Sequence, residues 1–176
     1  TRDVLTKKGK TIKLENYKLE SEIDKLGKID KVLTRGQLAL VQVVKEPIST
    51  KGPRLSCDIS IAGRFLVLVP FSNGVNISKK ITSKAERNRL QKLMTSIKPK
   101  NYGVIVRTVA EGKAVEEMER DLKESIAKWE EGIKKLIDAK PTERIIGEMS
   151  RATSMLRDLL NNDFDNVIVD SQDLYN

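Results

Sequence analysis

A chain of 176 residues in which 39% are hydrophobic is long enough for one compact domain, or two small ones, with a buried core. The 33 Lys and Arg residues against 25 Asp and Glu give a net charge of +8, which favours a polyanionic partner, nucleic acid first, and salt-dependent binding. The lack of histidine and the single cysteine, Cys57, exclude a Ser-His-Asp triad, a Cys-His pair and a cysteine-clustered zinc site within this sequence.

The cysteine count and the hydropathy also bear on location. One cysteine cannot form an internal disulfide, so we expect a reducing, cytoplasmic environment. No stretch approaches the roughly 20 apolar residues of a membrane span. The start, Thr-Arg-Asp, has neither a signal-peptide pattern nor an initiator methionine, and we expect the segment to come from a longer protein.

Residues 1 to 34 are rich in Lys, Glu and Asp and contain no long aliphatic run, which predicts a tether or loop. A helix over 19–32 is the alternative, because apolar residues recur every third position there. Gly27 interrupts that pattern and disfavours the helix.

Three short runs of β-forming residues follow, at 38–44, 55–61 and 65–69. A Gly-Pro-rich turn at 46–53 and Gly63 separate them. Short strands at this spacing are typical of a β-barrel or β-sandwich.

Beyond the turn at 72–74 the apolar spacing becomes helical. Ser83 followed by Glu86 is a capping box that starts a helix, and Pro99 stops it. The apolar face of this helix consists of Leu90, Leu93, Met94 and Ile97. A strand is predicted next, at 104–106.

A long amphipathic helix is predicted over 113–139, with one face in the core and the other solvated. Apolar residues recur there by threes and fours, and four Glu–Lys or Glu–Arg pairs stand in the favourable i,i+4 order. A helix over 142–160 and a strand over 167–169 complete the predicted elements. The mixture predicts an α+β fold without internal repeats.

Residues 103 to 108, Gly-Val-Ile-Val-Arg-Thr, place Arg107 and Thr108 at the end of a run that is typical of a buried strand. A guanidinium fork can give one phosphate group two parallel charge-assisted hydrogen bonds, and the threonine hydroxyl and backbone N–H can cap its other oxygens. The alternative is an ordinary solvated strand end. The pair is therefore a candidate phosphate site.

A second candidate is the loop at 45–54, where Lys45, Lys51 and Arg54 stand with two prolines between predicted strands. Rigid basic loops between barrel strands are where OB-type folds meet nucleic acid. An ordinary solvated hairpin loop is the alternative. Aromatic stacking platforms are scarce, at 4% of the chain, and the nearby candidates are Phe65, Phe71 and Tyr102.

Several blocks of the sequence repeat the order and spacing of a known family. They are Gly-Gln-Leu-Ala-Leu-Val-Gln-Val-Val-Lys-Glu-Pro-Ile-Ser-Thr-Lys-Gly-Pro-Arg-Leu-Ser (36–56), Ile-Ala-Gly-Arg-Phe-Leu-Val-Leu-Val-Pro (61–70), Ile-Val-Arg-Thr (105–108), Asp121-Leu122 seven residues before Trp129, and Leu156-Arg157-Asp158. Over about 35–170 the chain thereby resembles the ribonuclease E/G family of bacterial endoribonucleases. Residues 1 to 34 carry no motif of that family.

The resemblance implies an α+β chain that holds three pieces of a larger enzyme. These are the later strands of an OB-fold RNA-binding module over 35–62, a sensor subdomain for the RNA 5′ end over 63–154, and the start of a ribonuclease-H-like subdomain over 155–176. In such enzymes the sensor holds the 5′-monophosphate, and its occupancy promotes cleavage some nucleotides away. The full-length protein would be a hydrolase that uses Mg²⁺ to cleave single-stranded RNA in RNA processing and decay.

The resemblance also assigns site residues. Arg107 and Thr108 match the positions that hold the 5′-phosphate, and Gly63 and Val67 match positions beside the terminal nucleotide. Gly63 would let a base approach the backbone, and Val67 would offer an apolar or main-chain contact. Lys51 and the other two cations of its loop would contact the RNA backbone.

Catalytic and metal-binding residues are expected to be absent from this chain. The family's catalytic carboxylates, in Asp-Ile-Asn and Asp-Phe-x-Asp type motifs, and its zinc-binding cysteine pair have no counterpart here. Aspartates near the C-terminus are the only candidates for Mg²⁺, but the resemblance makes that stretch structural, and acidic residues suit a helix end and a turn. These candidates are Asp158, Asp163, Asp165, Asp170 and Asp173. We expect the chain to bind the RNA 5′ end without cutting it.

Two other functions stay open at this stage. One is a stand-alone RNA-binding or scaffold protein without nuclease activity. The other is a partner-binding helical module with the helix at 113–139 as its interface, which would leave an exposed apolar stripe. Homo-oligomerisation of the full-length protein is also open. A pair of Asp motifs beyond Asn176 would favour the enzyme over the binder.

Overall fold

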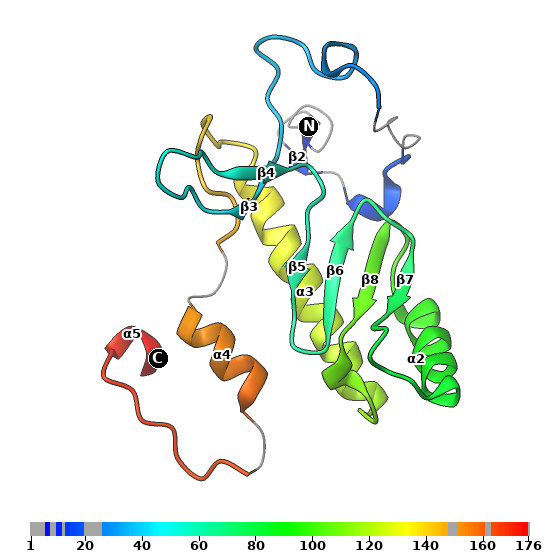
Figure 1. Cartoon of the computed structure of the whole chain (residues 1–176). Coiled ribbons are helices and arrows are strands. Elements are labelled where there is room, and N and C mark those ends of the chain that lie inside the picture. The colour runs from blue at the N-terminus through cyan, green and yellow to red at the C-terminus, as the bar shows by residue number, and fades with distance from the viewer. Residues whose placement is uncertain are drawn as a thin grey trace. The chain divides into compact units, whose positions relative to one another are not determined.

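The computed structural model describes residues 6–7, 10–11, 13–19, 26–147, 151–160 and 163–175. The chain divides into two compact units, Thr1–Ile145 and Ile146–Asn176 (Figure 1). Both α-helices and β-strands are present, so the predicted α+β class is confirmed. The described strands form two two-stranded sheets and one four-stranded sheet.

The described residues of the N-terminal stretch form short elements. β1 (Thr6–Lys7) pairs with β2 (Lys10–Thr11), and the 3-10 turns η1 (Leu14–Asn16) and η2 (Ile29–Lys31) follow. The alternative of a helix over 19–32 is wrong for 26–32, where η2 is the only helical turn, and residues 20–25 lie outside the described part. The apolar side chains at 26 and 29 are exposed, so no core stabilises a helix there.

β3 (Gln42–Lys45) and β4 (Arg54–Ser56) form an antiparallel hairpin with a register shift between Val43 and Lys45. The strand predicted over 38–44 thus begins later than the pattern indicated, and the run at 55–61 is divided between β4 and the next strand. The apolar side chains of this hairpin, Val43, Val44 and Leu55, are exposed.

The central sheet has the strand order β5-β6-β8-β7, formed by β5 (Ile61–Ala62), β6 (Leu66–Pro70), β7 (Val75–Ile77) and β8 (Tyr102–Val106). β6 is antiparallel to β8, and β7 is parallel to it. β7 was not predicted, because Val75-Asn76-Ile77 alternates apolar and polar residues over only three positions, which is too short a run to indicate a strand. One face of the sheet is closely packed, where Leu66, Leu68, Val104 and Val106 are buried.

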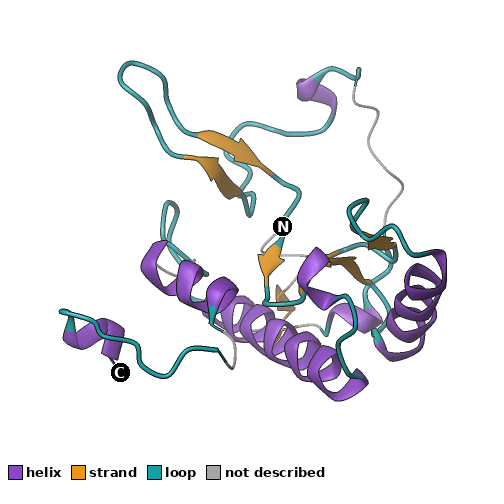
Figure 2. Cartoon of the chain, turned by 60° about the horizontal axis from the view of Figure 1, so that its bottom comes forward, coloured by secondary structure: helices purple, strands orange, loops and turns teal. Residues whose placement is uncertain are grey.

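Two helices complete the core of the first unit: α2 (Lys84–Ile97) and α3 (Val115–Lys135). Figures 1 and 2 show α3 running along β5 and β6, and α2 next to β7. Both predicted helices are confirmed, and the Ser83 Oγ accepts a hydrogen bond from the Glu86 backbone nitrogen at 3.4 Å, as the capping pattern indicated. α3 is shorter than 113–139 at both ends, because it begins at Val115 and a turn follows Lys135.

The apolar stripe of α3 is buried within this unit: Met118, Leu122, Trp129 and Ile133 face the core. Trp129 contacts Phe71 edge to face, with ring centroids 5.6 Å apart. A helix that served as a docking module would expose this stripe. The burial therefore argues against the helical partner-binding hypothesis.

The second unit contains α4 (Arg151–Leu159) and the short α5 (Gln172–Tyr175). The predicted helix over 142–160 is correct only for α4, since 142–147 form turns and 148–150 lie outside the described residues. The strand predicted over 167–169 is wrong: Ile168 is 94% exposed, and the described part of the chain offers that segment no strand to pair with. In the described ranges, every helix is too short or too polar to cross a membrane.

Candidate functional site

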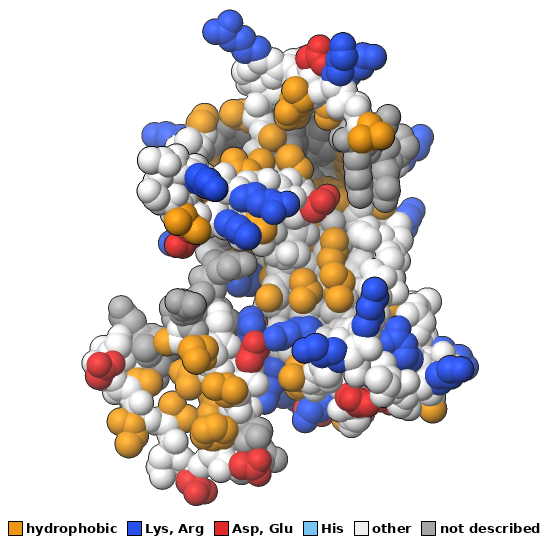
Figure 3. All heavy atoms as spheres, in the orientation of Figure 1, with side chains coloured by type: hydrophobic (Ala, Val, Ile, Leu, Met, Phe, Trp, Pro, Cys, Tyr) orange, Lys and Arg blue, Asp and Glu red, His pale blue; other side chains and the backbone are white. Residues whose placement is uncertain are grey.

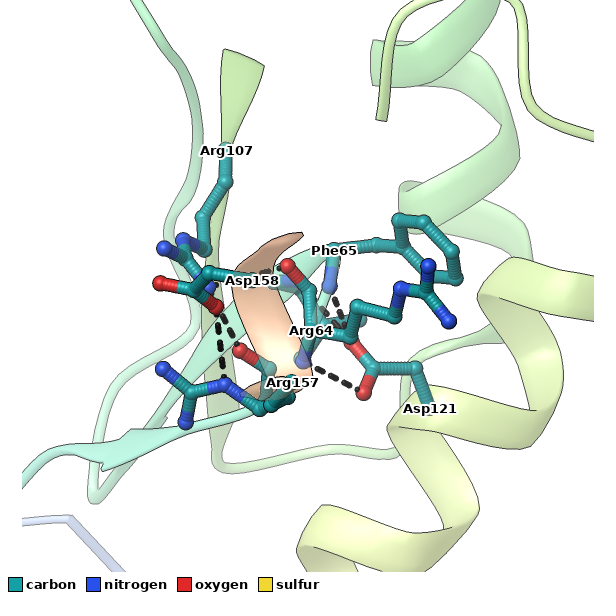
Figure 4. A network of polar contacts seen from close by, with 8 residues as sticks. Arg64, Phe65, Arg107, Asp121, Arg157 and Asp158 are labelled. Atoms are coloured by element: carbon teal, nitrogen blue, oxygen red, sulfur yellow. Dashed lines mark hydrogen bonds and ion pairs between the residues drawn. The ribbon is translucent and has the colours of Figure 1, made fainter. Parts of the chain in front are cut away.

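Arg107 stands where β8 ends and binds the turn between β5 and β6. Its Nη1 donates to the carbonyl oxygens of Gly63 and Arg64, both at 3.0 Å. Its backbone nitrogen donates to the Phe65 carbonyl oxygen at 2.8 Å. The guanidinium therefore has a fixed attachment to the turn at 63–65, and Figure 4 shows this turn lying against Arg107.

Asp121 holds the same turn from the opposite side. It comes from α3, and its side chain is 7% exposed. The carboxylate accepts hydrogen bonds from the backbone nitrogens of Arg64 at 2.8 Å, Phe65 at 2.8 Å and Leu66 at 3.0 Å. Three charge-assisted hydrogen bonds to one carboxylate make this turn a rigid part of the site.

Val67 lies on the face of the sheet that is less deeply buried. It pairs with Ile105 across β6 and β8, and the Ile105 residue is 41% exposed. Because side chains alternate along an extended chain, Ile105 of β8 and Arg107, one residue beyond its end, lie on the same face. An apolar pair beside a guanidinium is an arrangement that suits a base next to its phosphate.

Thr108 begins the 3-10 turn η3 (Thr108–Ala110) and is exposed. Its Oγ1 lies 2.9 Å from the Oγ of Ser78, which follows β7. Ser78 is in turn held by Arg87 of α2, whose Nη1 donates to the Ser78 carbonyl oxygen at 2.7 Å. The hydroxyl that was predicted to cap a phosphate is thus oriented by a second hydroxyl.

The segment after Thr108 is tied to α2 by Glu86. Its Oε1 accepts from the Gly112 backbone nitrogen at 2.9 Å, and its carboxylate binds the Arg89 guanidinium through two contacts of 2.7 Å. These hydrogen bonds, first from Arg89 and then from Gly112, lower the pKa of Glu86 to about 2. The carboxylate is therefore charged at neutral pH and fixes the turn that follows η3.

Two further cations gather at the β5–β6 turn. The Arg64 guanidinium carbon lies 5.4 Å from the centroid of the Phe65 ring, and the Lys113 Nζ lies 5.7 Å from it. Cation–π contacts of this kind keep charged groups near an aromatic side chain that is itself buried. With Arg107, three cationic side chains thus surround this turn, beside the Asp121 carboxylate and beside Glu117, whose Oε1 lies 3.8 Å from the Lys113 Nζ.

The basic residues of the loop at 45–54 lie elsewhere in the first unit, on the β3–β4 hairpin. Lys45, Lys51 and Arg54 are all exposed, and Figure 3 shows blue side chains gathered over this hairpin. Lys45 stands opposite Arg54 in the strand register, a like-charge pair that is unfavourable without a counter-anion. Ile48 and Lys51 close the tip through two backbone hydrogen bonds.

The structure thus brings Arg107 against the turn that contains Gly63, while Val67 lies on β6 next to β8 and Thr108 follows Arg107 in sequence. The three cations of the hairpin form a separate group. Asp121 belongs to a motif that the sequence shares with the family, but no local pattern indicated its role or that of Ser78. Asp121 and the turn are more than fifty positions apart in the sequence, and no local pattern predicts their contact.

The C-terminal aspartates are the candidates for Mg²⁺ that the sequence offers, although the resemblance makes that stretch structural. Asp158 accepts a hydrogen bond from Arg157 Nε at 2.9 Å, and Asp163, Asp165 and Asp170 are exposed. Among the described residues, no three Asp, Glu, Cys or His side chains converge in a way that would hold a metal ion. The described C-terminal aspartates therefore do not fit Mg²⁺.

Comparison with known proteins identifies relatives of this chain. The sequence model of the ribonuclease E/G family matches residues 60–176. The chain is 40% identical over 143 residues to ribonuclease E of Nostoc sp., an alignment that covers 81% of the chain and 21% of that protein.

Two more relatives extend the comparison. The chain is 34% identical over 147 residues to ribonuclease G of Salmonella typhimurium, covering 84% of the chain and 30% of that protein. It is 36% identical over 143 residues to a ribonuclease E/G-like protein of Pyropia yezoensis, covering 81% and 28%. The chain spans about a fifth to a third of the length of these relatives.

Proposed function

The chain belongs to the ribonuclease E/G family, and from this premise we propose that it is the RNA-binding and 5′-monophosphate-sensing part of an endoribonuclease. The longer protein would cleave single-stranded RNA in RNA processing and decay, with Mg²⁺ bound outside this chain. Residues 63–154 would form the 5′ sensor, 35–62 the later strands of an OB-type module, and 155–176 the start of a ribonuclease-H-like subdomain.

The attachment of Arg107 to the β5–β6 turn carries this proposal. Two carbonyl oxygens, both 3.0 Å from Nη1, fix the plane of the guanidinium. A planar fork with a fixed orientation binds phosphate through parallel charge-assisted hydrogen bonds at a small cost in conformational entropy. A 5′-phosphate would bind to the Arg107 guanidinium, and the Thr108 hydroxyl would contact another phosphate oxygen.

The neighbours of Arg107 suit the rest of the terminal nucleotide. Val67 and Ile105 form an apolar surface on the same face of the sheet. A base resting there would lie close to the β5–β6 turn at Gly63. The positive charge of Arg64 and Lys113 near the turn would attract the next phosphates of the RNA chain.

The β3–β4 hairpin would contact the RNA backbone rather than the bases. Lys45, Lys51 and Arg54 are exposed cations, and the Lys45–Arg54 pair places like charges opposite each other. An RNA phosphate between them would relieve this repulsion. Contacts to phosphate add affinity for RNA of any sequence.

Two RNA oligomers that differ only at the 5′ end test the sensor. The chain should bind the 5′-monophosphate form about 1–3 kcal/mol more tightly than the 5′-hydroxyl form, a ratio of roughly 5- to 150-fold. Arg107→Ala should abolish this preference. Lys123→Ala, which removes the same charge from an exposed position on α3, should keep it. Equal affinity of the folded wild-type chain for both oligomers would overturn the proposal.

A further inference from the structure

We propose that Asp121 is a positioning residue for the 5′-phosphate site, acting on Arg107 through the backbone of the β5–β6 turn. This inference rests on the proposed function. It assigns a role to a carboxylate that does not itself touch RNA. It also gives Gly63 a reason to be glycine that is independent of RNA.

The peptide units of the turn have two opposite hydrogen-bonding sides. In a trans peptide the N–H and the C=O of one unit point in opposite directions. The units that join Gly63 to Arg64, Arg64 to Phe65, and Phe65 to Leu66 are trans. Each of these units therefore presents its N–H to one side of the turn and its C=O to the other.

Asp121 and Arg107 occupy these two sides. All three N–H groups donate to the Asp121 carboxylate, at 2.8, 2.8 and 3.0 Å. The three C=O groups of the same units accept from Arg107, two from its Nη1 at 3.0 Å and one from its backbone nitrogen at 2.8 Å. Figure 4 shows the Arg64–Phe65 backbone between the two side chains.

Three consecutive peptide units thus bridge a carboxylate and an arginine. A peptide polarised by an anion at its N–H becomes a stronger acceptor at its C=O, because hydrogen bonds in series strengthen one another. The same hydrogen bonds also fix the orientation of the three peptide units. If Asp121 no longer holds the N–H groups, the carbonyls can turn away from Arg107. The orientation of the guanidinium therefore depends on a residue on the far side of the turn.

Gly63 is what allows the carboxylate to come so close. A Cβ at Gly63 would lie 2.6 Å from the Oδ1 of Asp121 and 2.7 Å from its Oδ2, closer than real Cβ atoms come to such neighbours. The side chain of Asp121 is 7% exposed and bound to three N–H groups, so it has little freedom to move aside. Alanine at 63 would displace the carboxylate and disturb the same bridge.

Positioning and simple electrostatics predict opposite results when Asp121 is neutralised. A nearby negative charge weakens the binding of a phosphate, so an effect of charge alone would raise affinity in Asp121→Asn. Loss of the hydrogen bonds between the carboxylate and the turn would instead lower the affinity for the phosphate. An asparagine amide offers one acceptor oxygen and turns an NH₂ donor toward an N–H group. The sign of the change separates the two.

The experiment measures the dissociation constants of 5′-monophosphate and 5′-hydroxyl RNA for the wild type, Asp121→Asn, Arg107→Ala and the double variant. All are measured well below their thermal unfolding midpoints. Asp121→Asn should reduce the 5′-phosphate preference by at least about fivefold, the equivalent of one good hydrogen bond. In the double variant the preference should be no lower than in Arg107→Ala alone. Glu119→Gln, which removes an exposed carboxylate from the same helix, should keep the full preference.

Substitution of Gly63 tests the same hydrogen bonds between Asp121, the turn and Arg107 independently. Gly63→Ala should lower the 5′-phosphate preference, and adding Asp121→Ala should lower it no further, because the second change removes the atoms that the new methyl group meets. If Asp121→Asn does not fold, Asp121→Glu replaces it, with the same expected loss, since the charge stays but the carboxylate moves outward by one methylene.

The outcomes for the two proposals differ. A wild-type chain without 5′-phosphate preference overturns the sensor itself, and this inference with it. A wild-type preference that survives Asp121→Asn, or that increases, overturns the positioning role of Asp121 and leaves the sensor standing.

Discussion

The Oε1 of Glu86 lies 2.9 Å from the backbone nitrogen of Gly112, so the first turn of α2 holds the turn that follows Thr108. Gly112 has a φ of +73°, a left-handed conformation that glycine adopts without strain. Arg89 completes the link by donating to Glu86 and, at 3.1 Å, to the carbonyl oxygen of Lys113. Part of the candidate site is thus fixed by an ionised carboxylate.

This carboxylate should make stability depend on pH in the acid range. The folded chain lowers the pKa of Glu86 from 4.5 to about 2, chiefly through its hydrogen bond with Arg89. The stabilisation is therefore complete above pH 4.5 and is lost as the pH falls through about 2. Glu86→Gln should lower the free energy of unfolding by about 1–2 kcal/mol at pH 7. The difference from the wild type should shrink steadily in unfolding experiments below pH 4.5.

Glu119→Gln is the matched control for this prediction. Glu119 forms an exposed pair with Lys123, and exposed pairs of this kind contribute about 0.3–0.5 kcal/mol. Its effect should be small at any pH. A Glu86→Gln deficit that stays constant down to pH 2 would contradict the role assigned to the ionised carboxylate.

Asn101 should anchor the N-terminal stretch to the sheet. It is 1% exposed, and its Nδ2 donates to the carbonyl oxygens of Leu14 at 2.8 Å and Tyr17 at 2.6 Å. Asn101→Ala would leave both carbonyls without this donor and place alanine at a φ of 66°, so we expect a loss of about 2–4 kcal/mol in the free energy of unfolding. Denaturant unfolding measures it.

Asn101→Gly separates the two causes. Glycine loses the same hydrogen bonds but adopts a positive φ without strain, so its stability should lie between those of the wild type and Asn101→Ala. If both variants are as stable as the wild type, the contacts to Leu14 and Tyr17 contribute nothing. The 5′-phosphate preference should be the same in all three proteins, because Asn101 takes no part in the site.

Lys51 should add affinity for RNA without adding specificity. A cation that contacts a backbone phosphate releases a counterion, so Lys51→Ala should weaken binding equally for all sequences and reduce the slope of log K against log salt by roughly 0.7 to 1. Titrations at several salt concentrations with unrelated single-stranded RNAs measure both effects. Unchanged affinity at every salt concentration would instead favour an ordinary solvated loop.

The chain by itself should not cut RNA, whatever the magnesium concentration. Phosphodiester hydrolysis at neutral pH requires a metal-held water and neutralised charge at the phosphate. We expect 5′-monophosphorylated single-stranded RNA to stay intact when it is incubated with the purified chain and Mg²⁺. Cleavage that disappears in an Asp165→Asn/Asp170→Asn double variant would show instead that these carboxylates form an active site.

Elements with strong local patterns could be predicted from the sequence. Ser83 and Glu86 marked the start of α2, and the apolar spacing from Met118 to Ile133 marked α3. Such signals arise within a few residues, where capping and helical periodicity act, and they need no tertiary partner. The predicted end of β8 also agrees with the structure, so Arg107 lies at a strand end as expected.

Elements without such patterns were missed or wrongly predicted. β7 forms because Val75–Ile77 pairs in parallel with β8, a partner that lies about thirty residues further along the chain. The apolar run at 167–169 has the composition of a strand but makes none in the described part of the chain. A strand forms only where a neighbouring strand pairs with it, and composition alone does not show whether such a neighbour is present.

The sequence by itself determined the family, the α+β class, and the candidate phosphate residues Arg107 and Thr108, because these depend on local residue order. Only the tertiary structure decided what surrounds Arg107. Because α3 packs along β5 and β6, the Asp121 carboxylate reaches the β5–β6 turn. It fits there because Gly63 has no side chain. Hydrogen bonds between residues more than fifty positions apart follow from that packing, and no short-range pattern encodes them.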